Sequence, residues 1–126
     1  MSEEKKKILV VEDDAILSDT YFKYLEKRNY EIETAFDGEE AIKKVEKFGP
    51  DLILLDLIMP KIDGIGVLKA LKNKEETKNI PILLLTNLED QDKIAEAVVL
   101  GCPNYLIKTE YTLDDIEKKM KDLMGV

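Results

Sequence analysis

The sequence contains no histidine, and its one cysteine is Cys102. Without histidine, the chain cannot build a histidine-based zinc site, a serine–histidine catalytic pair or a phosphohistidine carrier. With a single cysteine it cannot form an intramolecular disulfide bond, and we interpret Cys102 as a small buried hydrophobic residue. Any chemistry must therefore come from carboxylates, hydroxyl groups and lysines.

Long apolar runs are also absent, since none approaches the roughly 18 residues that a membrane-spanning helix needs. The N-terminal residues MSEEKKK are too polar, and the apolar run behind them is too short, for a secretory signal. Charged residues make up 37% of the chain, which is typical of a soluble surface. We therefore expect a cytoplasmic protein without a membrane partner.

The charge is unbalanced, because 19 Lys and Arg residues stand against 27 Asp and Glu residues, for a formal net charge of −8. An acidic chain repels phosphate backbones, so direct nucleic-acid binding is not expected. The length of 126 residues suits one domain, and a hydrophobic content of 44% supplies one core. We expect a flexible tail over residues 1–5 and a single domain over residues 6–126, with no effector domain attached.

Apolar and amphipathic segments alternate regularly along the chain. Five short apolar runs are expected to be strands: Ile8–Val11, Tyr30–Ala35, Leu52–Leu55, Ile82–Leu85 and Tyr105–Ile107. Helical spacing predicts helices from Ala15 to about Arg28, from about Asp37 to Phe48, around Val67–Leu71, over about Asp90–Leu100 and over Thr112–Leu123. Apolar runs without alternation are typical of strands buried on both faces of a parallel sheet, so we predict a doubly wound α/β fold.

Several residues are expected at helix starts rather than in a site. Asp14 is interpreted as the N-cap of the first helix, and Thr112 with Asp115 resembles a capping box. Gly64-Ile-Gly66 is interpreted as a helix entry, because it lacks the third glycine of a dinucleotide-binding motif. The apolar positions of the first helix follow helical spacing and are Ile16, Leu17, Tyr21, Tyr24 and Leu25.

Reactive side chains follow four of the five expected strands. The acidic run Glu12–Asp14 comes after the first strand, Asp56 after the third, Thr86 after the fourth and Lys108 after the fifth. In open parallel sheets, ligands bind outside the carboxyl ends of the strands, so we expect these groups to meet at one edge. A constellation drawn from four strand ends is harder to obtain by chance than any single motif.

Clustered carboxylates need a proton or a cation between them, because two of them about 4 Å apart repel by roughly 4 kcal/mol at an effective dielectric of 20. Hard oxygen ligands select Mg2+ or Ca2+, and the small ligand number without EF-hand spacing favours Mg2+. A carboxylate beside Mg2+ can attack phosphorus, while a lysine and a hydroxyl bind the phosphoryl oxygens. The residues therefore indicate a Mg2+-dependent phosphoryl-accepting site.

The motifs at these strand ends resemble the receiver domains of two-component response regulators. They are Ile8-Leu-Val-Val-Glu12-Asp13-Asp14, Leu54-Leu-Asp56-Leu-Ile-Met59-Pro60, Leu84-Leu-Thr86 and Tyr105-Leu-Ile-Lys108, and their order and spacing match over nearly the whole chain. The resemblance implies a flavodoxin-like (βα)5 fold with strand order 2-1-3-4-5 and helices on both faces. It is closest to the stand-alone, chemotaxis-regulator-like type.

The resemblance also assigns the site residues. Asp56 is expected to accept a phosphoryl group from the phosphohistidine of a histidine kinase or a histidine phosphotransfer protein. Mg2+ is expected to be held by Glu12, Asp13, Asp56 and the backbone carbonyl of Ile58. The protein is expected to promote only its own phosphorylation and dephosphorylation, and so not to be an enzyme acting on other substrates.

The switch residues implied by the resemblance are Thr86 and Tyr105, with Lys108 pairing with the phosphoryl group. Thr86 is expected to donate its hydroxyl to that group, and Tyr105 to change rotamer in step with it. The output face is expected over about Asp90–Leu100, Tyr105 and Thr112–Leu123. It would dock onto an unknown downstream protein, with the chain either monomeric or dimerising upon phosphorylation.

Five positions depart from the usual family pattern. Lys108 is followed by Thr109 instead of proline, so the loop is either trans with a different course or strained in cis. Asn87 stands where a small residue is usual, and Glu12 where aspartate is commoner. Ile58 and Leu88 are apolar at positions that influence attack by water, which predicts slow self-dephosphorylation.

Two other functions remain open on the residues alone. Thr109 and Asn87 leave room for a pseudo-receiver, a protein-binding module of the same fold that is not phosphorylated. A flavodoxin-like electron carrier would share the sheet but would need a Ser/Thr/Gly-rich phosphate loop after the first strand. The carboxylates of Glu12, Asp13 and Asp14 at that place would repel a flavin phosphate.

Overall fold

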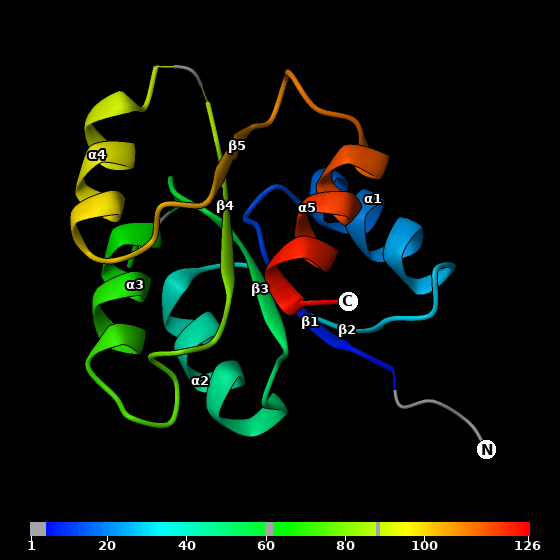
Figure 1. Cartoon of the computed structure of the whole chain (residues 1–126), viewed down its shortest axis with the longest axis horizontal. Coiled ribbons are helices and arrows are strands. Elements are labelled where there is room, and N and C mark those ends of the chain that lie inside the picture. The colour runs from blue at the N-terminus through cyan, green and yellow to red at the C-terminus, as the bar shows by residue number, and fades with distance from the viewer. Residues whose placement is uncertain (1–4, 60–61, 88) are drawn as a thin grey trace.

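Strands and helices alternate along the chain in a computed structural model that describes residues 5–59, 62–87 and 89–126 (Figure 1). The strands are β1 (Lys7–Val11), β2 (Glu31–Ala35), β3 (Leu52–Asp56), β4 (Ile82–Thr86) and β5 (Tyr105–Ile107). The helices are α1 (Ala15–Glu26), α2 (Gly38–Phe48), α3 (Gly64–Lys72), α4 (Gln91–Val99) and α5 (Leu113–Met124). The alternation expected from the sequence is confirmed; the expected tail lies almost wholly outside the described residues.

The five strands form one parallel sheet in the order β2-β1-β3-β4-β5, as expected. Their carboxyl ends are nearly level, because Val11 pairs with Ala35 on one side and with Leu55 on the other. On the far half of the sheet, Thr86 pairs with Ile107. Residues that end these strands or follow them directly are thus delivered to a single edge.

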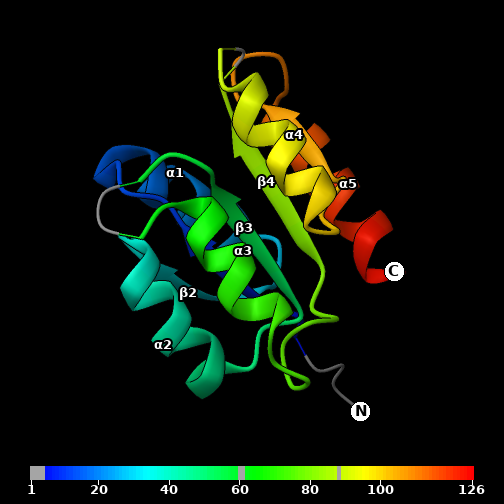
Figure 2. The ribbon, with the colours of Figure 1, turned by 90° about the vertical axis from the view of Figure 1, so that its left-hand side faces the viewer.

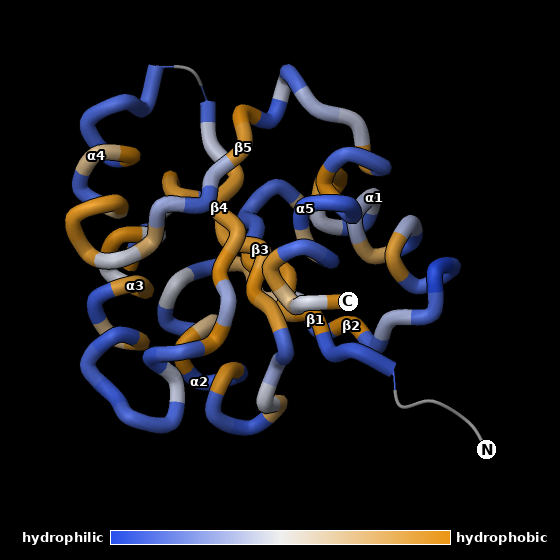
Figure 3. Tube along the Cα trace, viewed as in Figure 1, coloured by the Kyte–Doolittle hydropathy of each residue, from blue (hydrophilic) through white to orange (hydrophobic). Residues whose placement is uncertain are grey.

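Helices cover both faces of the sheet, with α1 and α5 on one side and α2, α3 and α4 on the other (Figure 2). Alternate strand residues face opposite layers: Ile8 and Val10 pack with α1 and α5, whereas Leu9 and Val11 pack with the other three helices. Each fully buried Leu or Ile contributes about 1.5–3 kcal/mol relative to an exposed one. The hydrophobic residues accordingly gather along the strands in the interior (Figure 3).

The predicted helix starts are confirmed. The side chain of Asp14 accepts hydrogen bonds from the amides of Ile16 and Leu17, at 2.9 and 3.0 Å. Thr112 and Asp115 form a capping box at the start of α5. Cys102 is buried in the core on the α2–α4 side, as expected. None of the described helices has the length and apolar character that crossing a bilayer requires.

The prediction that Ile16 belongs to the buried apolar face of α1 is wrong, because this residue is 82% exposed. The other predicted positions are confirmed, because Tyr21 and Leu25 are buried and Leu17 and Tyr24 pack against the core; Ser18 is buried as well. Leu17, Tyr21 and Leu25 are spaced by four residues and form one stripe, and neighbouring positions are rotated by about 100° around a helix. Ile16 therefore falls outside the stripe that faces the sheet.

The start of α3 is pressed against the end of β3. A Cβ atom on Gly64 would lie 2.7 Å from both the carbonyl oxygen of Asp56 and the Cα of Leu57. The amide of Gly64 also donates to the carbonyl of Leu57, at 2.9 Å. Only a residue without a side chain permits this close approach, so Gly64 helps to set the backbone position of Asp56.

Candidate functional site

Asp56 is the last residue of β3, and its side chain is buried at the carboxyl edge of the sheet. One carboxylate oxygen, Oδ1, accepts a hydrogen bond from the amide of Ile58 at 3.2 Å. The side chain of Ile58 is itself 44% exposed, so an apolar surface borders the carboxylate. The position of Asp56 agrees with the sequence analysis; coordination by the Ile58 carbonyl stays a prediction.

Glu12 reaches the same edge because the ladder of β1 continues one residue beyond the strand. The amide of Glu12 donates to the carbonyl of Ala35 at 3.0 Å, and its side chain is 2% exposed. Asp13, by contrast, is exposed. One carboxylate oxygen from each of Glu12, Asp13 and Asp56 lies within 4.8 Å of the others. The structure therefore brings together the three acidic side chains that were predicted to meet.

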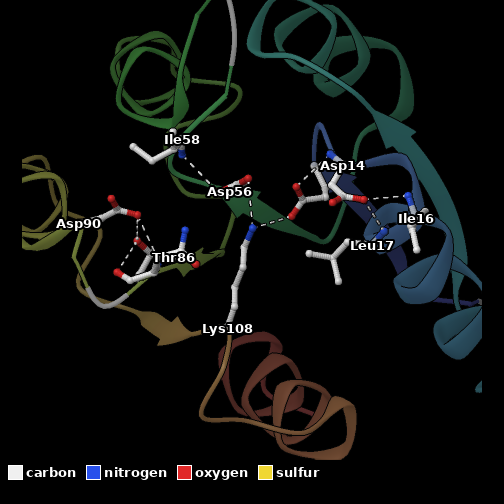
Figure 4. Close-up of polar contacts among 10 residues, drawn as sticks. Asp14, Ile16, Leu17, Asp56, Ile58, Thr86, Asp90 and Lys108 are labelled. Atoms are coloured by element: carbon white, nitrogen blue, oxygen red, sulfur yellow. Dashed lines mark hydrogen bonds and ion pairs between the residues drawn. The ribbon is translucent and has the colours of Figure 1, made fainter.

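Lys108 lies between the two buried carboxylates (Figure 4). Its Nζ is 2.9 Å from Oε1 of Glu12 and 3.2 Å from Oδ2 of Asp56. The backbone is held by the amide of Lys108, which donates to the carbonyl of Thr86 at 2.8 Å. No cis peptide bond occurs among the described residues, so the loop at Thr109 is trans and the lysine still reaches the site.

Burial dominates the electrostatics of this cluster. It raises the pKa of Glu12 to about 7, although the hydrogen bond from Lys108 opposes the shift. Burial also raises the pKa of Asp56, again against the attraction of Lys108. Burial alone would lower the pKa of Lys108, but its bonds to Glu12 and Asp56 more than offset this and the pKa is raised. The lysine stays charged while the carboxylates retain a tendency to bind a proton or a cation.

The charge balance of the site favours a cation. One ammonium cannot neutralise three carboxylates, and two ionised carboxylate oxygens no more than 4.8 Å apart repel by at least roughly 3.5 kcal/mol at an effective dielectric of 20. The donors are all hard oxygens, and too few are present for a Ca2+ cage. By its chemistry, the cluster suits a small divalent ion that keeps some of its water ligands.

Thr86 ends β4 and is fully buried, but its hydroxyl is already engaged. It donates to Oδ2 of Asp90 at 3.1 Å, and the amide of Asn87 donates to the same oxygen at 3.2 Å (Figure 4). Asp90 was not among the site residues predicted from the sequence. The feature of the sequence that could have identified Asp90 is a carboxylate four residues after Thr86, at the expected start of a helix.

Tyr105, the other predicted switch residue, lies on β5 with 41% of its surface exposed. It borders an open pocket of about 360 Å3 together with Gln91, Ile94, Ala95 and Ile107. Tyr105 and Thr86 are thus on neighbouring strands, next to α4. A change of rotamer stays a prediction. Asn87 is exposed, and Leu88 lies outside the described residues.

Known proteins resemble this chain in sequence and in structure. The response regulator receiver domain family matches residues 8–121. The alkaline phosphatase synthesis transcriptional regulatory protein PhoP of Bacillus subtilis is 42% identical over 103 residues, which are 82% of this chain and 42% of that protein. The chain spans about half the length of the curated relatives it matches.

Two solved structures share the whole fold. The chemotaxis response regulator CheY4 of Vibrio cholerae is 30% identical with a TM-score of 0.86, over 95% of this chain and 99% of that one. A response regulator receiver domain from Bermanella marisrubri is 34% identical with a TM-score of 0.83, over 95% and 98%. The family match, the sheet order and the cluster at the strand ends agree, and the chain belongs to the receiver-domain family of two-component response regulators.

Proposed function

We propose that this receiver domain accepts a phosphoryl group on Asp56 from the phosphohistidine of a histidine kinase or a histidine phosphotransfer protein. The observation that carries the proposal is the position of Lys108, whose ammonium bonds both Asp56 and Glu12 inside a cluster of three carboxylates. In the transfer, an oxygen of Asp56 forms a bond to phosphorus, while the bond from phosphorus to the histidine nitrogen breaks and its electron pair stays on the nitrogen.

The donor set fits Mg2+ as the cofactor of this reaction. Glu12, Asp13 and Asp56, with the carbonyl of Ile58, are the groups that would hold it. Bound Mg2+ supplies charge neutralisation for the carboxylates and for the transferred phosphoryl oxygens. Lys108, which directly follows β5, would add a further positive charge, and its Nζ is already 3.2 Å from Oδ2 of Asp56.

The signal would leave through the surface next to the switch residues. Thr86 would donate its hydroxyl to the phosphoryl group, and Tyr105 would respond on the neighbouring strand. The surface formed by α4, β5 and α5 would then bind a downstream protein, as a monomer or with dimerisation. In this view residues 6–126 act as one cytoplasmic signalling domain that modifies only itself.

A small phosphoryl donor tests the proposal without knowledge of the kinase. The protein is incubated with phosphoramidate and Mg2+, and its intact mass is measured. We expect the gain of one phosphoryl group, which Asp56→Asn and chelation by EDTA both abolish. The matched control Asp122→Asn removes an exposed carboxylate of α5 and should leave the gain unchanged. A wild-type protein that gains no mass would support the pseudo-receiver instead.

A further inference from the structure

Asp90 behaves differently from the other N-cap residues of the described helices. Asp14, Asp37, Asp63 and Thr112 each accept a hydrogen bond from an amide in the first turn of their own helix. Asp90 precedes α4 but makes no such bond. Since aspartate is among the best N-cap residues, at about 1 kcal/mol per cap, its carboxylate must be held by something else.

What holds the carboxylate is the end of β4. Its Oδ2 accepts both the hydroxyl of Thr86, at 3.1 Å, and the amide of Asn87, at 3.2 Å. The only other acceptor for the hydroxyl within the described residues is the carbonyl of Asn87, at a longer 3.4 Å. A bond to a charged acceptor is the stronger of the two, so Asp90 determines where the hydroxyl proton of Thr86 points.

A phosphoryl group on Asp56 would compete for this proton. A threonine hydroxyl has one proton to donate, and it can serve one strong acceptor at a time. A phosphoryl group brings three acceptor oxygens and about −1.5 to −2 charges. Thr86 would therefore have two anionic partners, Asp90 before phosphorylation and the phosphoryl group after it.

We propose that Asp90 is a positioning residue that holds the hydroxyl of Thr86 until a phosphoryl group takes it, an inference that rests on the proposed function. Once Thr86 turns toward Asp56, the carboxylate of Asp90 loses one of its two donors and keeps only the amide of Asn87, so it is free to turn toward its own helix. It then accepts a hydrogen bond from the backbone amide of Asp92 or Lys93. These are the N2 and N3 positions of α4, whose amides an N-cap side chain normally binds. The phosphoryl group is thereby coupled to the first turn of α4 through the exchange of one hydrogen bond.

The affinity for a phosphoryl analogue tests the competition. Beryllofluoride with Mg2+ is titrated into the protein and followed by NMR. Asp90→Ala should bind it about five- to tenfold more tightly, because the hydroxyl no longer has to leave a charged acceptor. Glu89→Gln removes one negative charge from the same loop without touching Thr86, and it should change the affinity less than twofold, about the effect of one screened surface charge.

A double-mutant comparison separates the hydrogen bond from general electrostatics. In a Thr86→Val background there is no hydroxyl to hold, so Asp90→Ala should no longer raise the affinity. An equal gain with and without the hydroxyl, or an equal gain from Glu89→Gln, would overturn the role of Asp90. Both results are readable even if one variant is less stable, because each affinity is measured on folded protein.

Hydrogen exchange tests whether the carboxylate of Asp90 moves to the first turn of α4. In the wild type, beryllofluoride should slow exchange at the amides of Asp92 and Lys93, and in Asp90→Ala it should not. Unchanged exchange in the wild type would contradict the release of Asp90. If the wild type binds no beryllofluoride at all, the phosphoacceptor function itself fails and this inference falls with it. Normal binding with an unaltered Asp90→Ala affinity refutes the inference alone.

Discussion

Glu12 is the residue whose environment departs most from that of an ordinary surface carboxylate. It is almost fully buried, and its nearest cation, Lys108, is shared with Asp56. Burial outweighs that attraction and raises the pKa of Glu12 to about 7. This buried glutamate is therefore expected to make the folding stability, and the binding of a metal ion at the cluster, depend on pH in the neutral range.

The free energy of unfolding should accordingly fall as the pH rises, when no divalent ion is present. Between the ordinary pKa of 4.5 and about 7, folded Glu12 keeps a proton that the unfolded chain loses. The folded state then binds more protons, so its stability decreases with pH. Urea unfolding in EDTA at about pH 5.5 and about pH 8 measures this, and Glu12→Gln should remove that part of the slope.

Mg2+ should act in the opposite direction, because it binds the ionised carboxylates. The stabilisation by a fixed Mg2+ concentration is expected to grow from about pH 5.5 to about pH 8. Stabilisation that is the same at both values would contradict the assignment of Glu12 to the metal cluster. Asp51→Asn, an exposed carboxylate at the other end of β3, is the control and should show the wild-type pH dependence.

Ile58 should slow the loss of the phosphoryl group. Its exposed side chain lies next to Asp56 and cannot orient a water molecule by hydrogen bonding. Replacing it by a polar residue supplies one such bond, so Ile58→Asn should shorten the phosphoryl half-life by about two- to tenfold. Decay is followed by intact mass after removal of the donor.

The same prediction extends to Leu88, whose position lies outside the described residues. Combining Ile58→Asn with Leu88→Glu should shorten the half-life further than either change alone. Ile16→Asn, at an exposed site on α1, is the control for introducing an asparagine. A phosphoryl half-life in the double variant as long as that of the wild type would show that these apolar residues do not limit attack by water.

At the scale of elements, the junction of β3 and α3 determines the position of Asp56. A side chain on Gly64 would collide with the backbone of Asp56 and Leu57, which cannot move without disturbing the sheet. Gly66 offers a contrast two residues later. A Cβ there would meet the Cγ2 methyl group of Ile62 at 2.4 Å, and a turn of that side chain about χ1 moves the methyl group without shifting any backbone.

Gly64→Ala is therefore expected to lower the free energy of unfolding by about 2–3 kcal/mol, as in other overpacked sites. Gly66→Ala should cost less than about 1 kcal/mol, because helix propensity favours alanine over glycine by a similar amount. Urea unfolding of both variants measures the difference. Equal costs for the two substitutions would show that the backbone contact at Asp56 does not constrain the junction.

Most of the elements could be predicted from the sequence because their signals are local. Apolar runs of the right length predicted the strands, and Asp14, Thr112 and Asp115 marked the starts of two helices. The course of the loop at Thr109 could not be predicted, since a trans and a cis bond were both compatible with the residue type. The backbone bond from Lys108 to Thr86, which depends on the assembled sheet, holds the lysine in place.

Individual side chains were harder to predict than elements. Ile16 fits a helical pattern. Whether its side chain faces the sheet or the solvent depends on which side of α1 packs against the sheet, and the spacing alone does not determine this. Asp90 was placed correctly near the start of a helix, yet an aspartate there can cap its own helix or bond a neighbouring strand. That choice depends on the buried hydroxyl of Thr86, which no local pattern reveals.

At the scale of the whole molecule, the site exists because a parallel sheet brings distant residues to one edge. The bond between Lys108 and Glu12 spans 96 positions of the sequence. Strand order places β1 and β3 side by side, so Glu12 and Asp56 become neighbours as soon as those strands pair. This convergence was predictable, since topology and strand ends together determine it.

The most direct test of the account is the location of the phosphoryl group. After reaction with phosphoramidate and Mg2+, treatment with borohydride reduces an aspartyl phosphate to homoserine, and peptide mass spectrometry locates the change. We expect homoserine at position 56 alone, and none when EDTA is present during the reaction with phosphoramidate. Homoserine at Asp13 or at another carboxylate, or a stable phosphate that resists borohydride, would contradict it.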